Sequence, residues 1–424
     1  MATALPAAAL AGTLLTACGS GDGGPPVVTW YVNNVEQESL AATCSAESDS
    51  YQIETVLLPA AASGQREQLL RRLAANDRTV DLMSLDPPFM AEFANAGFLR
   101  PFTDAEREEL SEGVLDGPLE QSIFDDTMFS APFYGNTQLL WYKRSVAEEA
   151  GLDMSQPVTW EQIIQAAEDT GTTVAAQGRR NESLTVWVNA LVESDGGTIL
   201  ENGSEGLPAD EVQPAIDSPA GARAAEVMRT LADSPAAPPA LSTAGEEESR
   251  AAFQSDTGGF MVNWPYVWAA FAAAEDDGSL PADFREDVGW TRYPRVDPDV
   301  ESATPLGGIG LSVGAFSENP DLALEALRCL RSPESQTAYM LAAGDPAASA
   351  AVYEDPEIQE VFPMYEQIRS GLEVAAPRPI SPYYGDVTGV IQAGYHPPDE
   401  LSPDVTPRAT ANLMLGVLSN QQLL

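Results

Sequence analysis

Positive charge is scarce in this chain. Its 424 residues include 21 Lys and Arg against 64 Asp and Glu, which gives a formal net charge of −43, and Lys143 is the single lysine. A surface this acidic repels the phosphates of nucleic acids and the headgroups of anionic lipids, so the composition argues against both as partners. Because 44% of the residues are hydrophobic, the acidity does not indicate disorder.

Residues for nucleophilic catalysis and metal binding are also few. The single histidine, His396, lies beside Pro397 and Pro398 in a turn-like context. The one Gly-x-Ser-x-Gly sequence, GLSVG at 310–314, falls on an expected strand and lacks the strand-to-helix turn of a nucleophile elbow. No two Cys or His residues have the spacing of zinc ligands, so we expect no metal site. A glycoside hydrolase needs only two carboxylates, and the many acids leave that alternative open. The sequence favours a binding protein without a cofactor over an enzyme.

The first of three cysteines follows an apolar segment. The uncharged residues 1–17 predict a signal peptide, and the sequence LTAC that ends at Cys18 is typical of a bacterial lipobox. The Gly- and Pro-rich residues 18–26 predict a flexible tether. No later segment approaches the roughly 20 apolar residues of a membrane-spanning helix. We therefore expect a lipid on Cys18 that anchors the protein at the extracellular face of the cell membrane. The alternative is a chance cysteine behind an apolar stretch.

Cys44 and Cys329 remain as a pair. Exported proteins fold in an oxidising compartment, where cysteines form disulfides. We therefore predict a disulfide between Cys44 and Cys329, which would join two segments that lie far apart in the sequence. The alternative is that these two residues are separate buried thiols.

The length of the chain and its alternating elements predict an α/β fold. A mature chain of roughly 400 residues is too long for one hydrophobic core, which suggests two lobes. From residue 27 onward, β-rich runs alternate with segments of helical periodicity, and this order predicts parallel strands joined by crossover helices. The expected strands are 27–32, 51–58 and 80–85, and the expected helices are 37–44, 66–75 and 87–97.

Helices dominate the pattern after the aromatic, β-rich residues 129–143. Thr159 and Gln162 have the spacing of a capping box, so we expect a helix to begin after Thr159. The second half of the chain therefore also predicts mixed α/β structure. Its further expected elements are helices at 183–194, 219–233, 246–254 and 320–331, and strands at 259–264 and 311–313.

Four segments, taken in order, resemble the extracellular sugar-binding proteins of bacterial ATP-driven (ABC-type) importers. They are PVTWE at 157–161, AFQSDTGGFMVNWP at 252–265, GGIGLS at 307–312 and SPESQ at 332–336. The resemblance implies an α/β, two-lobe periplasmic-binding-protein-like fold with the ligand in the interlobe cleft. It also implies a monomer that delivers its sugar to ABC permease subunits. On this basis we expect lobe one at 27–136 and 306–362, and lobe two at 137–305 and 363–424.

A second set of motifs is more specific. The segments VDLMSLDPPF at 80–89, AEFANAGFL at 91–99, YGNTQLLWY at 134–142 and PRP at 377–379 resemble the trehalose-recycling lipoproteins of mycobacteria. This resemblance implies a solute-binding lipoprotein that captures an extracellular disaccharide, namely trehalose. The alternatives are another α-glucoside such as maltose or sucrose, a sensory protein that presents its ligand to a membrane receptor, and an extracellular glycoside hydrolase.

Sugar chemistry and the two resemblances together select the candidate binding residues. A sugar offers a weakly apolar C–H face to an aromatic ring, and a rim of hydroxyls to carboxylates, amides and guanidinium groups. Trp264, at the end of an expected strand, is the candidate aromatic platform, and the alternative is a core tryptophan. Asp86 is a candidate hydroxyl partner or, alternatively, the N-cap of the helix that Pro87 opens.

Further candidates lie along the rest of the chain, each with a structural alternative. Asn136 precedes the expected crossover between the lobes, and its alternative is a turn residue. Arg378 lies between two prolines, which suits a rigid clamp, and its alternative is a surface ion pair. Gly308 would let a backbone amide approach the ligand closely, or it forms an ordinary turn. The resemblance alone adds Asn34, Gln65 and Glu246 as ligand-binding positions.

Overall fold

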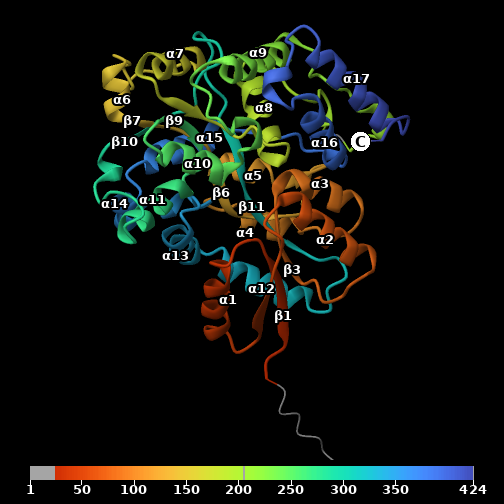
Figure 1. Cartoon of the computed structure of the whole chain (residues 1–424). Helices are drawn as coiled ribbons and strands as arrows, with labels where there is room; N and C mark the ends of the chain where they lie inside the picture. Colours follow the sequence, from red (N-terminus) through yellow and green to blue (C-terminus); the bar gives the residue numbers. More distant parts are fainter. Residues whose placement is uncertain (1–23, 204–205, 424) are drawn as a thin grey trace, which may run out of the picture.

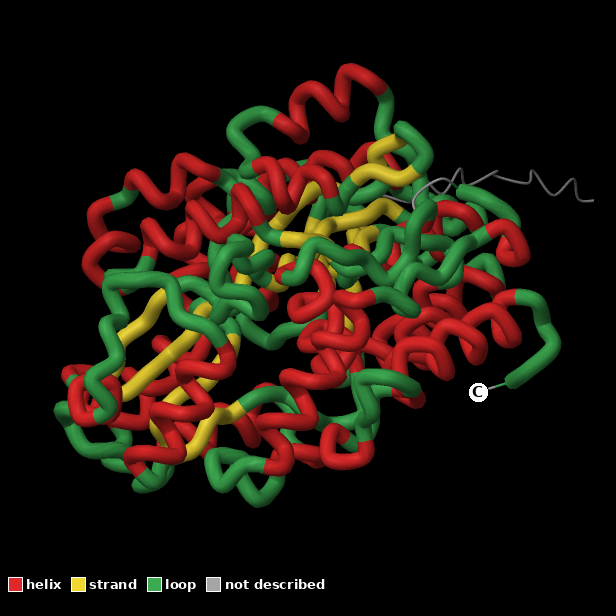
Figure 2. Tube along the Cα trace, turned by 90° about the horizontal axis from the view of Figure 1, so that it is seen from above, coloured by secondary structure: helices red, strands yellow, loops and turns green. Residues whose placement is uncertain are grey.

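The chain forms two α/β lobes, each built on its own β-sheet. The structure, a computed structural model, describes residues 24–203 and 206–423. The predicted signal peptide and the predicted lipidation site Cys18 lie outside these ranges. The N-terminal sheet occupies the lower half of the molecule in Figure 1, and Figure 2 shows the strands in groups with helices packed around them.

The first sheet has six strands of mixed direction. They are β1 (Val27–Val32), β2 (Gln52–Leu57), β3 (Leu82–Leu85), β6 (Ala131–Thr137), β11 (Pro305–Val313) and β12 (Ala376–Pro377). Their order is β12-β11-β3-β1-β2, and β6 also pairs with β11. β1 lies parallel to β2 and β3, whereas β11 is antiparallel to β3 and β6.

Helices connect the parallel strands of this first lobe, so the strand–helix order predicted from residue 27 onward is confirmed. Val28 of β1 and Leu82 of β3 have no exposed surface and share one hydrophobic core. Burial of these apolar side chains under the helices is the main stabilising contribution to this lobe. The helices and the small hairpin are α1 (Gln37–Ala46), α2 (Ala62–Ala74), α3 (Pro87–Asn95), α4 (Asp104–Ser111), α5 (Asp116–Glu120), β4 (Ile123–Phe124) and β5 (Thr127–Met128).

The second sheet has four strands in the order β10-β7-β9-β8. They are β7 (Leu139–Lys143), β8 (Thr173–Ala175), β9 (Gly258–Asn263) and β10 (Val288–Thr291). β9 lies between an antiparallel neighbour, β7, and a parallel one, β8. Trp141 of β7 is fully buried and packs on Trp268 and Phe271, so the core beneath this sheet is rich in aromatic rings.

The helices of the second lobe begin at local sequence signals. Thr159 and Gln162 form the predicted capping box, in which the Thr159 hydroxyl accepts from the Gln162 N–H (3.2 Å) and the Gln162 side chain accepts from the Thr159 N–H (2.8 Å). Two of the helices, α9 and α10, have the predicted bounds. The set is α6 (Arg144–Glu149), α7 (Trp160–Thr170), α8 (Glu182–Ser194), α9 (Pro219–Asp233), α10 (Glu246–Gln254) and α11 (Tyr266–Asp276).

Helices of the C-terminal region are shared between the lobes. α12 (Pro320–Leu330) packs on the first sheet, whereas α16 (Tyr384–Gly394) and α17 (Thr406–Leu418) pack with α8 and α9. No helix within the described ranges is long and apolar enough to cross a lipid bilayer. The other elements are α13 (Pro333–Ala343), α14 (Pro356–Val361), α15 (Tyr365–Val374) and the 3-10 turns η2 (Ala209–Glu211), η3 (Leu241–Thr243), η4 (Phe284–Glu286), η5 (Ala350–Glu354) and η6 (Pro398–Glu400).

The chain passes between the two sheets at several points. β6 leads into β7 through Gln138, β10 is followed by β11, and β12 is followed by α16. Tyr353 and Leu372, which come between α13 and β12, share a core with Trp141 of the second sheet. The lobe boundaries expected from the sequence stay a prediction. These connections matter for function because they keep the ends of strands from both sheets close to one another.

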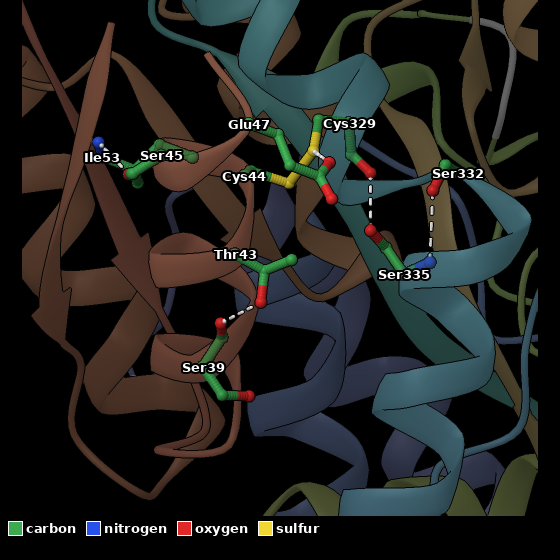
Figure 3. Close-up of a disulfide and its surroundings, with 9 residues drawn as sticks. All are labelled: Ser39, Thr43, Cys44, Ser45, Glu47, Ile53, Cys329, Ser332 and Ser335. Atoms are coloured by element: carbon green, nitrogen blue, oxygen red, sulfur yellow. Dashed lines mark hydrogen bonds between the residues drawn. A yellow bond between two sulfur atoms is a disulfide. The ribbon is translucent and has the colours of Figure 1, made fainter.

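A disulfide joins helices α1 and α12 within the first lobe. Cys44 and Cys329, the pair predicted from the sequence, form this bridge with their Cα atoms 5.9 Å apart (Figure 3). Cys44 is fully buried in the core beneath β1. Because 285 positions separate the two residues, the bridge fastens a late helix of the chain to an early one.

Candidate functional site

A cavity of about 300 Å³ lies between the two sheets. This volume is at the lower end of the range of small-molecule sites. Lobe one contributes residues that follow β1, β2 and β3, and lobe two contributes the starts of α8 and α10 and the end of β9. The polar, aromatic and glycine residues of its lining are Asn33, Ser63, Gln65, Asp86, Tyr134, Asn136, Asn181, Glu182, Ser183, Glu246, Trp264, Gly307, Gly308 and Arg378.

Trp264 forms part of the cavity wall where β9 ends. Its indole packs against Gly307, because a Cβ atom added there would lie 3.0 Å from the Cη2 atom of the ring. The indole Nε1 donates to the Glu246 carboxylate at 3.1 Å. The ring is therefore held in place from two sides, by glycine backbone and by a carboxylate, as a rigid aromatic wall requires.

Asp86 follows β3 at its carboxyl end, as the sequence predicts. It occupies the N-cap position of α3, but its side chain makes no capping hydrogen bond. The carboxylate instead accepts from Arg378, with Oδ1 2.7 Å from Nη2 and Oδ2 3.3 Å from Nη1. Asp86 is thus both the N-cap residue of α3 and a lining residue of the cavity, where its side chain is held by an ion pair.

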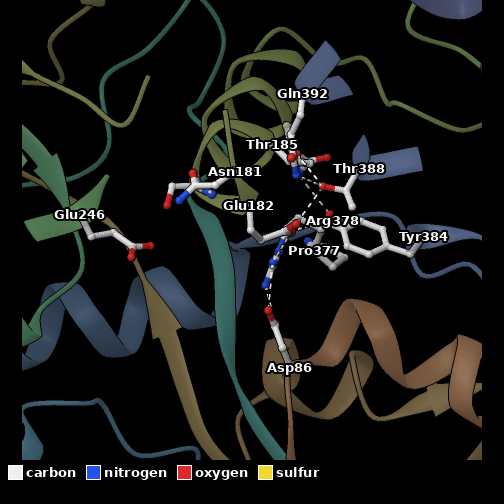
Figure 4. Close-up of polar contacts among 12 residues, drawn as sticks. Asp86, Asn181, Glu182, Thr185, Glu246, Pro377, Arg378, Tyr384, Thr388 and Gln392 are labelled. Atoms are coloured by element: carbon white, nitrogen blue, oxygen red, sulfur yellow. Dashed lines mark hydrogen bonds and ion pairs between the residues drawn. The ribbon is translucent and has the colours of Figure 1, made fainter. Parts of the chain in front are cut away.

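Arg378 follows β12 and is buried, with 6% of its side chain exposed. Besides Asp86, it donates to Glu182 Oε1 at 2.6 Å, so one guanidinium joins a carboxylate from each lobe (Figure 4). Burial lowers the pKa of Arg378, but the nearby charge of Asp86 and the groups of Tyr384 and Glu182 outweigh it and hold the pKa well above the usual value. The guanidinium therefore stays charged, and the alternative of a surface ion pair is wrong.

Glu182 is a cavity residue that the sequence analysis missed. It begins α8, directly after the N-cap Asn181, whose side chain accepts from the Ser183 N–H. The Glu182 carboxylate accepts from the Tyr384 hydroxyl and, at 2.8 Å, from Thr388 Oγ1. Burial raises the pKa of Glu182, and the charge of Arg378 opposes that rise. The sequence around Glu182 shows the start of a helix, through the N-cap Asn181, but it does not indicate a binding role for Glu182.

Asn136 of β6 lies opposite Gly307 of β11, and Gly308, the next residue of β11, lies opposite Gly135. The Asn136 amide donates to Asp345 Oδ1 at 3.4 Å, and its carbonyl accepts from the Thr137 N–H at 3.1 Å. Gly308 has φ of +116°, and a Cβ atom there would lie 2.3 Å from the backbone oxygen of Tyr134. Glycine is therefore required at 308 by its positive φ and by this close strand contact.

The structure brings seven of the eight candidate residues into the cavity lining and leaves out Asn34. The neighbouring Asn33 lines the cavity instead, and its amide donates to the Tyr134 hydroxyl at 3.3 Å. Asn34 accepts from the Glu36 N–H at 3.4 Å in the turn before α1. Both residues follow the end of β1 at Val32, and the expectation that Asn34 lines the cavity is wrong by one position. Gln65 reaches the lining from α2.

The lining suits a polyhydroxylated ligand. Carboxylates, amides and a guanidinium can each hydrogen-bond two neighbouring hydroxyls, and the indole of Trp264 supplies an apolar face. Two α/β lobes around such a cavity define a two-lobe ligand-binding protein. The sequence profile of the family described as bacterial extracellular solute-binding protein matches residues 50–337, more than half of the chain. The chain belongs to this family, whose description is that of proteins that bind extracellular solutes.

Known relatives and solved structures are similar to the chain over different lengths. A probable ABC transporter-binding protein of Deinococcus radiodurans is 28% identical over 59% of this chain, and the match spans 59% of that protein's own length. The maltose-bound MalE3 of T. maritima superposes with a TM-score of 0.80 and 24% identity, over 93% of this chain and all of that one. The GacH receptor of Streptomyces glaucescens gives a TM-score of 0.76 and 19% identity over 94% and 100%. These structural likenesses show the fold.

Proposed function

We propose that this protein captures an extracellular disaccharide, trehalose, and delivers it to an ABC-type sugar importer. One observation carries the proposal: the cavity between the lobes combines an aromatic wall, Trp264, with the planar polar groups of Asp86, Asn136 and Arg378. An aromatic plane beside bidentate polar groups is the arrangement that binds the C–H face and the hydroxyls of a sugar at once. The family assignment and the trehalose-type motifs point in the same direction.

Binding is proposed to act through the relative position of the lobes. Asp86 comes from lobe one, whereas Glu182, Glu246 and Trp264 come from lobe two, so a ligand in the cavity contacts both. A ligand that contacts both sides favours the state in which they are close, because its binding energy is larger there. We propose that the permease subunits of the importer recognise this closed state of a monomer.

The membrane attachment is also a proposal. The sequence LTAC before residue 19 is the signal for a lipid on Cys18, and the Gly- and Pro-rich residues 18–26 would separate the lobes from the membrane. A lipid anchor at the extracellular face would keep the binding protein close to its permease. It holds the protein at the surface without crossing the bilayer.

Isothermal titration calorimetry with trehalose, maltose, sucrose and glucose tests the ligand assignment. We expect trehalose to bind most tightly, and glucose to bind more weakly because it can fill only part of a disaccharide site. Analysis of the sugar after incubation should recover it unchanged, since the protein is a binding protein. Absence of heat with all four sugars would reject the sugar proposal. Tighter binding of sucrose than of trehalose would reject trehalose as the ligand and leave the sugar proposal in place.

Maltose is the second candidate ligand. The observation that favours it is the maltose-bound T. maritima structure, whose backbone superposes on 93% of this chain. Maltose and trehalose are both α-linked glucose disaccharides, so the same polar groups can serve either. The ratio of their affinities in the same titration decides between them.

A further inference from the structure

The cavity carries an excess of negative charge. Its lining contains three carboxylates, Asp86, Glu182 and Glu246, and one cation, Arg378. With all four groups ionised the formal charge of the lining is −2, inside a protein whose net charge is already −43. Low-dielectric walls make such charges act more strongly on a bound ligand than they would in water. The cavity therefore has an electrostatic preference in addition to its hydrogen-bonding groups.

Arg378 does not balance all three carboxylates, because its hydrogen bonds go to two of them. Both terminal nitrogens donate to Asp86 or Glu182, at 2.6–3.3 Å. The two pairs form one cluster around the guanidinium, and Figure 4 shows this cluster with Glu246 standing apart from it. Arg378 acts on Glu246 at longer range and ranks behind two neutral hydrogen bonds in lowering its pKa.

Glu246 is thus the carboxylate of the cavity without a cation of its own. Its side chain accepts from the neutral Nε1 of Trp264 at 3.1 Å, and no ion pair within residues 24–203 and 206–423 involves it. Burial raises its pKa, and the hydrogen bonds from Trp264 and Ser183 oppose that rise. Its place in the first turn of α10 also favours the ionised form, because the helix N-terminus is electropositive.

We propose that Glu246 makes the cavity select its sugars by charge, admitting neutral and amine-bearing sugars and rejecting those that carry phosphate, sulfate or carboxylate. The inference rests on the proposed function, since it assigns a substrate class to the same cavity. A protonated amine near Glu246 would supply the missing cation, whereas an anion would face a carboxylate that no local positive charge neutralises. Repulsion of this kind corresponds to about ten- to a hundredfold in affinity.

The test compares derivatives of trehalose that differ in charge and little in size. 6-Amino-6-deoxytrehalose replaces one hydroxyl by an amine, and the 6-sulfate and 6-methanesulfonate esters are an anion and its neutral analogue. We expect the wild-type protein to bind the amine at least about tenfold more tightly than trehalose, and the sulfate at least about tenfold more weakly than the methanesulfonate. The affinities are measured by calorimetry at pH 8 and low ionic strength, where screening is weak.

Glu246→Gln keeps an oxygen that accepts from Trp264 and removes the charge. We expect both affinity ratios to shrink at least about threefold in this variant. Glu247→Gln is the matched control, because Glu247 is the next residue of the same helix and its carboxylate pairs with Arg250 outside the cavity. That variant should leave both ratios unchanged. Circular dichroism establishes that each variant is folded.

Three outcomes overturn the inference. Equal affinities of the wild-type protein for trehalose and for its amine would show that the cavity does not select by charge. This comparison is sufficient even if neither ester binds. Ratios that stay the same in Glu246→Gln assign the selectivity to other groups. If Glu246→Gln does not fold, the affinities of the wild-type protein are measured at lower pH instead. A preference for the amine that persists when Glu246 is protonated would contradict the proposal. Absence of binding by every sugar would instead reject the proposed function itself.

Discussion

Arg378 and Asp86 are 292 positions apart in the sequence, and their side chains are joined by two hydrogen bonds at the cavity between the lobes. The same guanidinium donates to Glu182, at the start of α8 in the second lobe. Arg378 itself follows β12, an edge strand of the first sheet. A single buried cation thus connects the end of β3 to the start of α8, and it does so within the lining of the candidate binding site.

The first prediction concerns this cation. Arg378→Gln should lower the free energy of unfolding by about 3–5 kcal/mol, because two carboxylates would remain buried without their counter-charge. Sugar affinity should fall at least about tenfold as the carboxylates lose their fixed positions. Urea unfolding followed by circular dichroism, and calorimetry with trehalose, measure the two effects.

Arg408→Gln serves as the control for this experiment. The Arg408 side chain is 72% exposed, and its contact with Asp217 is long, at 3.5 Å. Exposed ion pairs of this kind contribute about 0–1 kcal/mol, so this variant should unfold and bind as the wild type does. Equal losses of stability and affinity in the two variants would show that the Arg378 ion pairs contribute no more than an exposed ion pair does.

The second prediction concerns the aromatic wall. Trp264→Ala should weaken trehalose binding at least about tenfold, since it removes the apolar face offered to the sugar. Trp264→Phe should bind with intermediate affinity, because it keeps a ring but loses the Nε1 donor to Glu246. Calorimetry measures both. Trp290→Phe, which alters a tryptophan packed on Trp268, is the control and should bind normally. Unaltered affinity in a folded Trp264→Ala protein would place the sugar elsewhere.

The third prediction is a pH dependence of stability caused by Asp345. Burial raises the pKa of Asp345 to about 7, and its neighbours are the Tyr339 hydroxyl at 3.2 Å and the Asn136 amide at 3.4 Å. Between pH 4 and 7 the folded state holds this proton and the unfolded state does not, so the contribution of Asp345 to stability falls as the pH rises. Above the folded-state pKa the full cost of the buried charge remains.

Asp345→Asn removes this cost and tests the assignment. The variant should be more stable than wild type at pH 8 by on the order of 1–4 kcal/mol, and nearly equal to it at pH 4. Thermal unfolding of both proteins across this range gives the difference directly. The exposed Asp276→Asn substitution should show no such pH-dependent difference. A stability difference between wild type and Asp345→Asn that is the same at all pH values would show that it does not arise from the ionisation of Asp345.

The fourth prediction concerns the disulfide. Replacing Cys44 and Cys329 together by Ala should destabilise the protein by about 2–4 kcal/mol, because the closed loop restricts the unfolded chain. A thiol-reactive dye applied to a denatured, unreduced chain that begins at residue 24 should find no free cysteine. Two reactive thiols per chain would contradict the bridge.

The fifth prediction concerns the lipid anchor. Cys18→Ala should release the protein from the membrane fraction into the medium, because the acyl chains that hold it would no longer be attached. Fractionation of the producing cells followed by immunoblotting measures the distribution. Membrane retention of Cys18→Ala equal to that of the wild type would reject lipidation at this residue.

Much of the local structure could be predicted because its signals are local. The bounds of α9 and α10 follow from helical periodicity, and the capping box of Thr159 and Gln162 is a motif of four consecutive residues. Asp86 could be placed at a site because the carboxyl end of a parallel strand is where α/β lobes bind ligands. Each of these inferences depends on neighbours in sequence.

The rest of the site depends on contacts that no local pattern encodes. Glu182 looks like an ordinary first-turn helix residue, and it faces the cavity because Tyr384 and Thr388 of α16 hold its carboxylate. The resemblance alone indicates Asn34 rather than Asn33, although the bounds of β1, Val27–Val32, follow from the sequence. The partners of Arg378 likewise became visible only in three dimensions.

The position of Arg378 also limits how this binding site can evolve. Because its guanidinium is at once a wall of the cavity and the link between Asp86 and Glu182, a substitution there would change the cavity lining and the contact between the lobes together. Gln65 and Ser63 line the same cavity near the start of α2, outside that ion-pair cluster. Under the proposed function, new ligand specificities would therefore arise more readily through such peripheral positions, with Arg378 retained.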